Sequence, residues 1–175
     1  MRRSVLYIAM SLDGYIAAED GEVSWLEGDG SDPEDAGSFE TFYGMTGTMV
    51  MGRNTYDQIV TELSPGSWPY PDKECFVVTD RGGKPVEGVT FTDTPPAELV
   101  GRLKELSGRD IWVCGGSDIA CQLLRAGAID RIWVSVVPKM LGRGVRLFTD
   151  VPEADLKLIG TRVYNGITDL VYERR

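Results

Sequence analysis

Hydrophobic and polar residues follow two alternating patterns along the chain, which predict strands separated by helices. Short apolar runs of strand length recur at residues 4–10, 48–51, 75–79, 89–91, 111–114 and 129–137. Apolar residues with helical spacing lie between them, at residues 54–63 and 96–106 and again after residue 117. Two last strands, about 156–164 and 167–172, flank Asn165-Gly166, a strong signal for a two-residue hairpin. This order predicts an α/β protein with a mostly parallel central sheet, flanking helices and a C-terminal antiparallel hairpin.

One segment combines a buried strand, a double glycine and a helix start. Residues 111–116 form the strand and its turn, and Ser117 is expected to be the N-cap of the helix. The backbone N–H groups of such a helix start can hold a phosphate, although a tight turn without a ligand has the same pattern. A second unit of this shape surrounds Gly52. Because ligands of open α/β sheets bind outside the carboxyl ends of the strands, Gly52, Thr79 and Gly115 should gather at one rim.

Charged side chains follow two of these strands. Arg53, Thr79 and Arg81 would suit a phosphate monoester, such as the 2′-phosphate that distinguishes NADP from NAD. Each arginine alone could instead serve solubility. Asp80 keeps another interpretation open, because an acid after a strand can hold the ribose of NAD.

A further helix is predicted to start near Asp32, with Asp32 as N-cap, Pro33 as its first residue and Asp35 in its first turn. Phe39 and Phe42 continue its apolar stripe, and Asp35 shares their i, i+4, i+7 spacing. Asp35 is therefore either an acid favoured at a helix start or a partly buried catalytic or substrate-anchoring carboxylate.

The composition excludes several kinds of chemistry. The 175 residues include no histidine, which removes the usual catalytic triads and histidine metal ligands, and no metal site is predicted. The net charge of -9 argues against nucleic acid or an anionic membrane as a partner. No apolar stretch is long enough to span a bilayer, and three cysteines without a C-x-x-C pair indicate reduced thiols in a cytoplasm. The length predicts a single domain over residues 1–175.

Four motifs resemble the dihydrofolate reductase-like superfamily in the right order. They are AMSLDGYIA at 9–17, VMGRNTY at 50–56, VCGGSDI at 113–119 and PKMLGRGVRLF at 138–148. The closer resemblance is to the reductase domain of bacterial riboflavin biosynthesis, in which S-x-D-G-x-I-A and P-x-x-x-G-x-G segments recur. The deaminase domain that often accompanies this reductase is not expected here. The resemblance implies a stand-alone 5-amino-6-(5-phosphoribosylamino)uracil reductase-like protein, or a relative with another substrate.

The resemblance also implies a binding site for NADPH. Ala9 and Ile16 would line the nicotinamide end, and Thr79 and Arg81 would hold the 2′-phosphate. The adenosine-phosphate and pyrophosphate contacts would come from Gly52, Arg53, Asn54, Thr55, Gly115, Gly116, Ser117, Asp118 and Ile119. The peptide between the two glycines would be cis. Asp35 would match the acid of folate reductases if one residue of loop length is allowed before the second motif.

The implied activity is hydride transfer from NADPH to a C=N or C=O carbon of a ribosylaminopyrimidine-type substrate. Dihydrofolate or another pteridine or heterocycle is an alternative acceptor, and a nucleotide-binding module without turnover is an alternative of another class. Asp35 or bulk solvent would supply the proton. Trp25, Leu26 and Phe39 would either form the flat apolar wall of the ring pocket or pack in the core. A homodimer through residues 129–137 and the terminal hairpin is expected, because these strands carry more apolar residues than an exposed edge tolerates.

Overall fold

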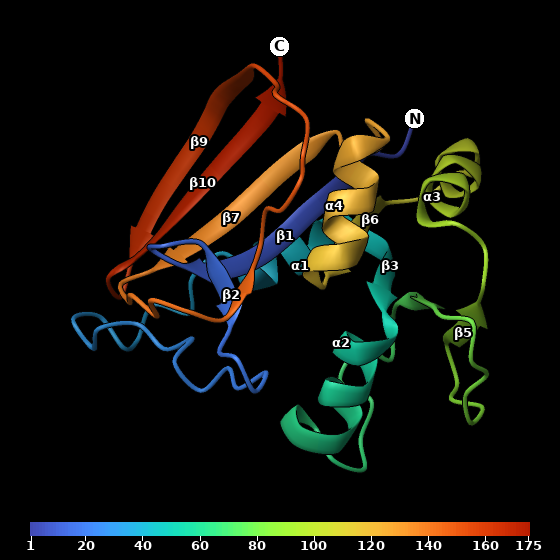
Figure 1. Ribbon diagram of the computed structural model, residues 1–175, viewed down its shortest axis with the longest axis horizontal. Coiled ribbons are helices and arrows are strands. Elements are labelled where there is room, and N and C mark those ends of the chain that lie inside the picture. The colour runs from blue at the N-terminus through green and yellow to red at the C-terminus, as the bar shows by residue number, and fades with distance from the viewer.

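A computed structural model describes residues 1–175, which form an eight-stranded sheet with helices on both faces (Figure 1). Its strands are β1 (Ser4–Ser11), β3 (Thr46–Gly52), β4 (Glu74–Val78), β5 (Val89–Thr92), β6 (Asp110–Gly115), β7 (Arg131–Val137), β9 (Leu156–Tyr164) and β10 (Ile167–Arg174). They lie in the order β5-β4-β3-β6-β1-β7-β10-β9. The strands from β5 to β7 are parallel, whereas β10 and β9 are antiparallel to their neighbours. The predicted fold class is confirmed.

The helices divide between the two faces of this sheet. They are α1 (Phe39–Met45), α2 (Arg53–Gln58) with its π-helical continuation η1 (Ile59–Leu63), α3 (Pro96–Glu105) and α4 (Ser117–Arg125). Side chains of α3 and α4 pack on one face, and side chains of α1, α2 and η1 pack on the other. None of these helices combines the length and the hydrophobicity that crossing a bilayer requires.

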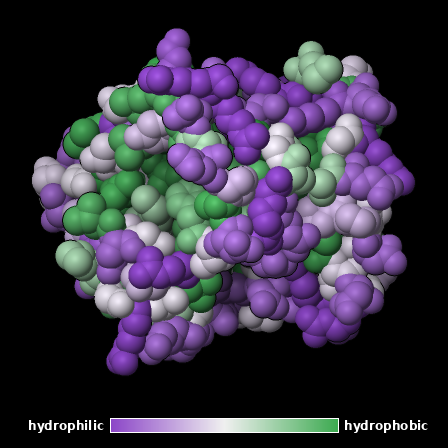
Figure 2. Space-filling model, turned by 45° about the horizontal axis from the view of Figure 1, so that its top comes forward, coloured by the Kyte–Doolittle hydropathy of each residue, from purple (hydrophilic) through white to green (hydrophobic).

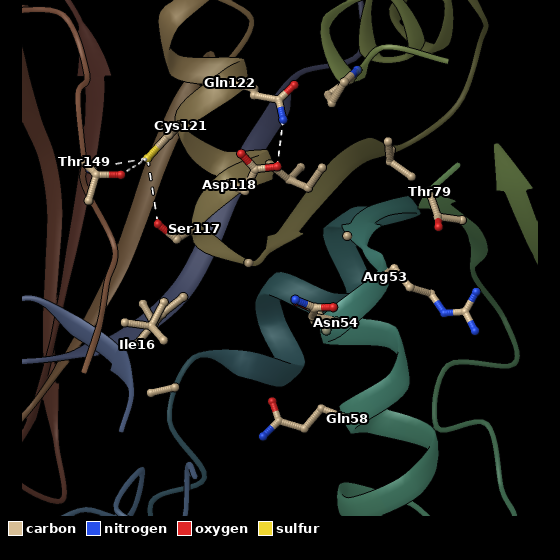
Figure 3. Close-up of a pocket in the computed structure, with 18 of the residues that line it drawn as sticks. Ile16, Arg53, Asn54, Gln58, Thr79, Ser117, Asp118, Cys121, Gln122 and Thr149 are labelled. Atoms are coloured by element: carbon tan, nitrogen blue, oxygen red, sulfur yellow. Dashed lines mark hydrogen bonds between the residues drawn. The ribbon is translucent and has the colours of Figure 1, made fainter. Parts of the chain in front are cut away.

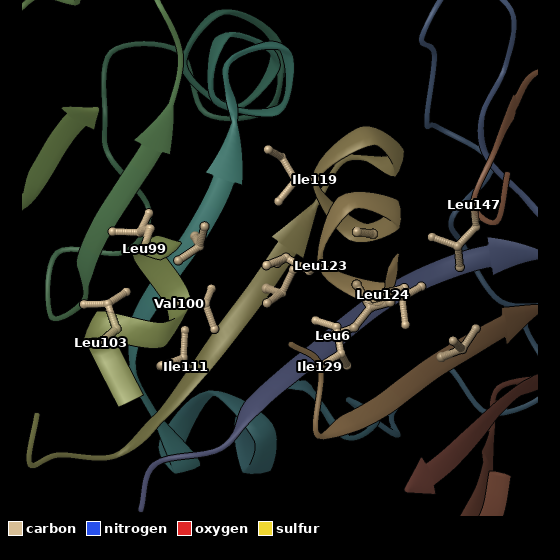
Figure 4. Packing of buried hydrophobic residues seen from close by; sticks show 14 residues of the cluster. Leu6, Leu99, Val100, Leu103, Ile111, Ile119, Leu123, Leu124, Ile129 and Leu147 are labelled. Carbon is tan, nitrogen blue, oxygen red and sulfur yellow. The ribbon is translucent and has the colours of Figure 1, made fainter. Parts of the chain in front are cut away.

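Successive side chains of each strand point to opposite faces of the sheet, and this produces two separate apolar cores. In β1, Leu6 is fully buried in a cluster of 14 residues under α3 and α4, whereas its neighbour Val5 joins a cluster of nine under α1 and α2. Figure 4 shows the first cluster, to which α3 contributes Leu99, Val100 and Leu103 and α4 contributes Leu123. The second cluster is rich in aromatic rings. The α3 and α4 face is therefore the more extensive apolar core.

The terminal hairpin turns where the sequence predicts. Asn165 and Gly166 both have positive φ, at 45° and 73°, as a two-residue turn between twisted strands requires. A short pair, β2 (Tyr15–Ala17) and β8 (Val145–Arg146), was not predicted and lies outside the main sheet.

The predicted start of the first helix near Asp32 is wrong, because α1 begins at Phe39. Asp35 lies instead in the preceding loop, where its Oδ1 accepts a hydrogen bond from the Gly37 N–H at 2.8 Å and from Arg162 Nη2 at 2.7 Å. Gly37 has a φ of +72°, which turns the chain out of any right-handed helix. Asp35 and Phe39 therefore do not share a helical stripe.

Candidate functional site

A cavity of about 740 Å³, here called the rim cavity, lies at the carboxyl ends of β3, β4 and β6 (Figure 3). Its volume is in the ordinary range for small-molecule sites. The predicted residues that line it are Ile16, Gly52, Arg53, Asn54, Thr55, Thr79, Arg81, Gly116, Ser117, Asp118 and Ile119. Two predicted residues do not line it: Gly115 is the last residue of β6, and Ala9 shares with Tyr7 the face of β1 that points toward α1.

The N-terminus of α4 opens into the rim cavity. The Gly115–Gly116 peptide that leads into it is cis, as predicted. Ser117 does not cap the helix as expected: Gly116 is the N-cap, and Ser117 Oγ donates to the carbonyl of Arg146 at 2.6 Å. Because no side chain caps this end, the backbone N–H groups of the first turn remain available to a ligand.

Two glycines allow the backbone segments around the rim cavity to approach each other closely. A Cβ on Gly52 would lie 3.1 Å from Ile119 Cγ1, so a side chain there would push β3 away from α4. A Cβ on Gly116 would lie 3.4 Å from Thr55 Oγ1, in ordinary contact, and would fill space between α4 and α2. The glycines therefore leave backbone rather than side chains at the surface of the cavity.

Arg53 and Thr79 follow β3 and β4 and lie on one side of the rim cavity (Figure 3), and Arg81 lines the cavity two residues after Thr79. The Arg53 guanidinium donates from Nε to Asp57 at 2.7 Å and from Nη1 to the carbonyl of Gly82 at 3.0 Å. Thr79 Oγ1 accepts the backbone N–H of Arg81 at 3.0 Å, which leaves its hydroxyl proton free to donate elsewhere. Arg53 is thus held in place, whereas the Arg81 side chain is 69% exposed.

The charges around the rim cavity balance. Three arginines and three aspartates line it: Arg53, Arg81, Arg125, Asp80, Asp93 and Asp118. The net charge of -9 is therefore carried elsewhere on the surface. At the Arg53 end each arginine has an aspartate beside it, Asp57 at Arg53 and Asp80 at Arg81, so a phosphate there would be bound by directed N–H donors rather than by a net positive charge.

Asp13, in the first of the four motifs, joins that motif to the last. Its Oδ1 accepts hydrogen bonds from Ser11 Oγ at 2.6 Å and from the Leu141 N–H at 3.1 Å, and its Oδ2 accepts the Gly142 N–H at 2.7 Å. The Ser11 hydroxyl and these backbone donors lower the pKa of Asp13 to about 2. Asp13 therefore joins the turns that lead into the paired strands β2 and β8, whose residues Ile16 and Val145 line the rim cavity.

Several residues that line this cavity carry no signal among the motifs described above. They are Gln58, Cys121, Gln122, Arg125 and Thr149, among others. Helical periodicity could have identified two of them, because Gln58 lies four residues after Asn54 and Gln122 four residues after Asp118. Gln122 Nε2 donates to Asp118 Oδ2 at 2.8 Å (Figure 3). Thr149 comes from a distant loop, and no local pattern marks it.

A second cavity of about 280 Å³, here called the hairpin cavity, lies on the opposite side of β1, between α1 and the C-terminal hairpin. It is lined by Ser38, Thr41, Trp133, Gly160, Thr161, Arg162, Asp169 and Val171. The predicted ring-pocket residues Trp25, Leu26 and Phe39 line neither cavity. Phe39 is 38% exposed and contacts Tyr7 and Trp112. Asp35 reaches the hairpin cavity only through its ion pair with Arg162.

The sheet order and the rim cavity define a protein with the dihydrofolate reductase-like fold. Dihydrofolate reductase from Enterococcus faecalis, complexed with NADP(H), superposes with a TM-score of 0.71 at 19% identity, over 99% of this chain and 96% of that one. The sequence model of the RibD C-terminal domain matches residues 4–172, and the chain belongs to this family.

Two relatives cover the whole chain. The uncharacterized protein YwjB of Bacillus subtilis is 38% identical over 99% of this chain and 98% of its own. A crystal structure from Shewanella sp. PV-4, whose name assigns it to riboflavin biosynthesis, has a TM-score of 0.82 at 25% identity and covers 99% of both chains. The family and the folate-reductase neighbour are oxidoreductases.

Proposed function

We propose that the protein is a reductase that binds NADPH in the rim cavity and transfers a hydride to a ribosylaminopyrimidine-type substrate. Family membership and the riboflavin-biosynthesis name of the Shewanella protein support the reaction class. The observation that carries the proposal is the layout of the rim cavity. The uncapped first turn of α4 lies in one part of it, and the Arg53, Thr79 and Arg81 group lies in another. This layout suits a ligand that carries a pyrophosphate and a separate phosphate.

The residues present fit this cofactor. Gly52 and Gly116 leave bare backbone where phosphates would lie, and Ile16 of β2 offers an apolar contact beside Gly116. When bound, the cofactor supplies the hydride. The part played by the chain is to hold the donor ring and the acceptor close together in a fixed orientation.

The proton that follows the hydride is assigned to Asp35 first, with bulk solvent as the alternative. In this structure the Asp35 carboxylate is paired with Arg162, whose side chain lines the hairpin cavity. The pair would have to open, or to act through water, for Asp35 to reach an acceptor. The location of Asp35 beside the hairpin cavity supports this role, although Asp35 precedes α1 and is not part of that helix.

The test is to mix the protein with NADPH and a panel of aminopyrimidines and pteridines, including dihydrofolate, and to follow the loss of NADPH absorbance. Turnover of a ribosylaminopyrimidine supports the proposal. Turnover of dihydrofolate alone would make the protein a pteridine reductase. Binding of NADPH without turnover of any acceptor would make it a nucleotide-binding module.

We also propose that the protein forms a homodimer through its C-terminal strands. Exposed apolar side chains are frequent on the edge strand β9, where Leu158 is 48% and Val163 is 70% exposed. Figure 2 shows hydrophobic side chains gathered on the side of the molecule that carries this hairpin. An edge strand of this kind favours pairing with another chain. Light scattering at micromolar concentration should give twice the monomer mass, and Val163→Glu should restore the monomer.

The free thiols of Cys75, Cys114 and Cys121 support a reducing compartment, the cytoplasm, as the place where the protein acts.

A further inference from the structure

The hairpin cavity contains two buried polar atoms that have no hydrogen-bond partner in the chain. They are Asp169 Oδ2 and Trp133 Nε1, and both residues line the cavity. The Asp169 side chain belongs to a residue that is only 1% exposed. A buried carboxylate oxygen and a buried indole N–H without partners are unfavourable in a folded chain unless something binds them.

The rest of the Asp169 carboxylate is fixed. Its Oδ1 accepts hydrogen bonds from Ser135 Oγ at 2.6 Å and from the Tyr164 hydroxyl at 3.1 Å. Burial raises the pKa of Tyr164, and burial also raises the pKa of the neighbouring Tyr7. Both phenols therefore stay protonated at neutral pH, so that Tyr164 remains a donor. This network leaves one buried carboxylate oxygen of Asp169, Oδ2, without a partner.

The strand register relates this oxygen to the proposed cofactor site. Ala9, Ser135, Asp169 and Arg162 are directly opposite one another across β1, β7, β10 and β9. Asp169 is two strands from Ala9, or about 10 Å at ordinary strand spacing. Ala9 is the residue predicted at the nicotinamide end, so the hairpin cavity lies on the side where an acceptor would meet the donor ring.

The two free groups are complementary to one kind of ligand. Trp133 and Asp169 are diagonal neighbours across the β7–β10 pair, because Trp133 is opposite Val171 and Ser135 is opposite Asp169. One offers a donor and the other an acceptor. The guanidinium of Arg162 is already paired with Asp35 and with the carbonyl of Gly37, so the cavity offers no unpaired cation to an anionic group.

We propose that the hairpin cavity is the acceptor subsite and that Asp169 and Trp133 determine its specificity. Asp169 Oδ2 accepts a ring N–H of a cyclic amide, and Trp133 Nε1 donates to the adjacent carbonyl. The inference rests on the proposed function for the location of the cofactor, but it assigns the recognition of the acceptor to residues of β7 and β10. Asp35 and Phe39 then lie at the mouth of the subsite.

The probe pair is 5,6-diaminouracil and its 1,3-dimethyl derivative, which lacks the ring N–H donors. Isothermal titration of the wild-type protein should show that the dimethyl compound binds at least ~10-fold more weakly, as for the loss of a hydrogen bond to a charged group. Asp169→Asn should reduce this ratio to about one, because the amide presents a donor or a weaker acceptor. Trp133→Phe keeps the ring and removes the N–H, and should weaken both compounds about fivefold.

NADPH titration of the same proteins separates this inference from the proposed function. The acceptor subsite is supported if both variants keep their affinity for NADPH, Asp169→Asn loses the discrimination between the probes, and Trp133→Phe binds both probes more weakly. The proposal is overturned if wild-type protein does not distinguish the two probes, or if both variants keep the affinity and the preference. If the wild-type protein does not bind NADPH, the proposed cofactor is wrong. The probe titrations do not use NADPH, so they still test whether the hairpin cavity binds a cyclic amide.

Discussion

The expected preference for NADPH over NADH depends on Arg53, which is held by other groups of the chain, and on Arg81, which is mostly exposed. Substitutions of the two arginines should therefore have different effects. Arg53 is 24% exposed and is fixed by Asp57 and by the carbonyl of Gly82. A charge-assisted hydrogen bond from such a group is worth about 1.5–3 kcal/mol, so Arg53→Gln should reduce the NADPH preference by about 10-fold or more. Arg81 is 69% exposed, and an exposed ion pair is worth about 0.2–1 kcal/mol. Arg81→Ser should therefore reduce the preference about fivefold or less.

The measured quantity is the ratio of the NADH and NADPH dissociation constants for each protein, obtained by fluorescence titration. Using the ratio cancels any effect of the Arg53 substitution on the rest of the cavity, such as the loss of its contact with Asp57. Raising the salt concentration should lower the ratio in wild-type protein, mainly through the exposed Arg81. Asp80→Asn is the matched control: its carboxylate is 93% exposed near Arg81, and removing the negative charge should leave the ratio unchanged or raise it.

Two results would refute this reasoning. Equal ratios in the wild-type protein and in both arginine variants would show that no phosphate lies at this end of the rim cavity. A preference of the wild-type protein for NADH that Asp80→Asn abolishes would show instead that Asp80 holds a ribose.

The remaining predictions concern single side chains. Gly116→Ala should weaken NADPH binding while changing the free energy of unfolding little, because the added methyl group makes only ordinary contacts with the chain; equal NADPH affinity would mean that this backbone does not touch the cofactor. Asp35→Asn should leave NADPH affinity nearly intact and reduce turnover at least ~10²-fold, and wild-type turnover would assign the proton to solvent. Phe42→Ala should cost about 3–5 kcal/mol in urea unfolding, because Phe42 is 1% exposed, whereas Phe39→Ala, at 38% exposure, should cost much less. The pKa of Asp13 is lowered to about 2 in the folded state, so its contribution to stability is full above pH 3.8 and is lost as the pH falls towards 2; the difference in stability between wild-type protein and Asp13→Asn should shrink over that range in acid unfolding experiments.

The glycine turns of the rim cavity could be predicted from the sequence, because each turn depends on only a few neighbouring residues. A glycine directly after a buried strand, as at Gly52 and Gly116, marks the rim whatever the rest of the chain does. Asp35 shows the limit of that approach. Asp32 and Pro33 are good helix-start residues, yet the chain turns at Gly37 and Asp35 pairs with Arg162, which is 127 residues away. Only the folded sheet brings that partner into reach.

The hairpin cavity could not be predicted for a related reason. Asp169 lies in the terminal hairpin, for which the sequence predicts dimer contacts and no ligand site. Its significance comes from the register that places it opposite Ser135 on the inner face. An acid between apolar residues at positions 167 and 171 of one strand face is the signal that could have identified it.

One face of the sheet is closed by a large apolar core, whereas the loop before α1 on the other side is mostly exposed, and this difference affects where the sequence can change. The α3 and α4 face is closed by 14 buried residues, whereas the chain between β2 and α1, residues 18–38, is mostly exposed and contributes no residue to either apolar cluster. Substitutions at exposed positions of that loop that make no contact with the terminal hairpin therefore cost little folding free energy, and the loop leads directly to Ser38 at the hairpin cavity. If the hairpin cavity is the acceptor subsite as proposed, such changes would alter which acceptor binds, while the rim-cavity residues on α2 and α4 stay the same.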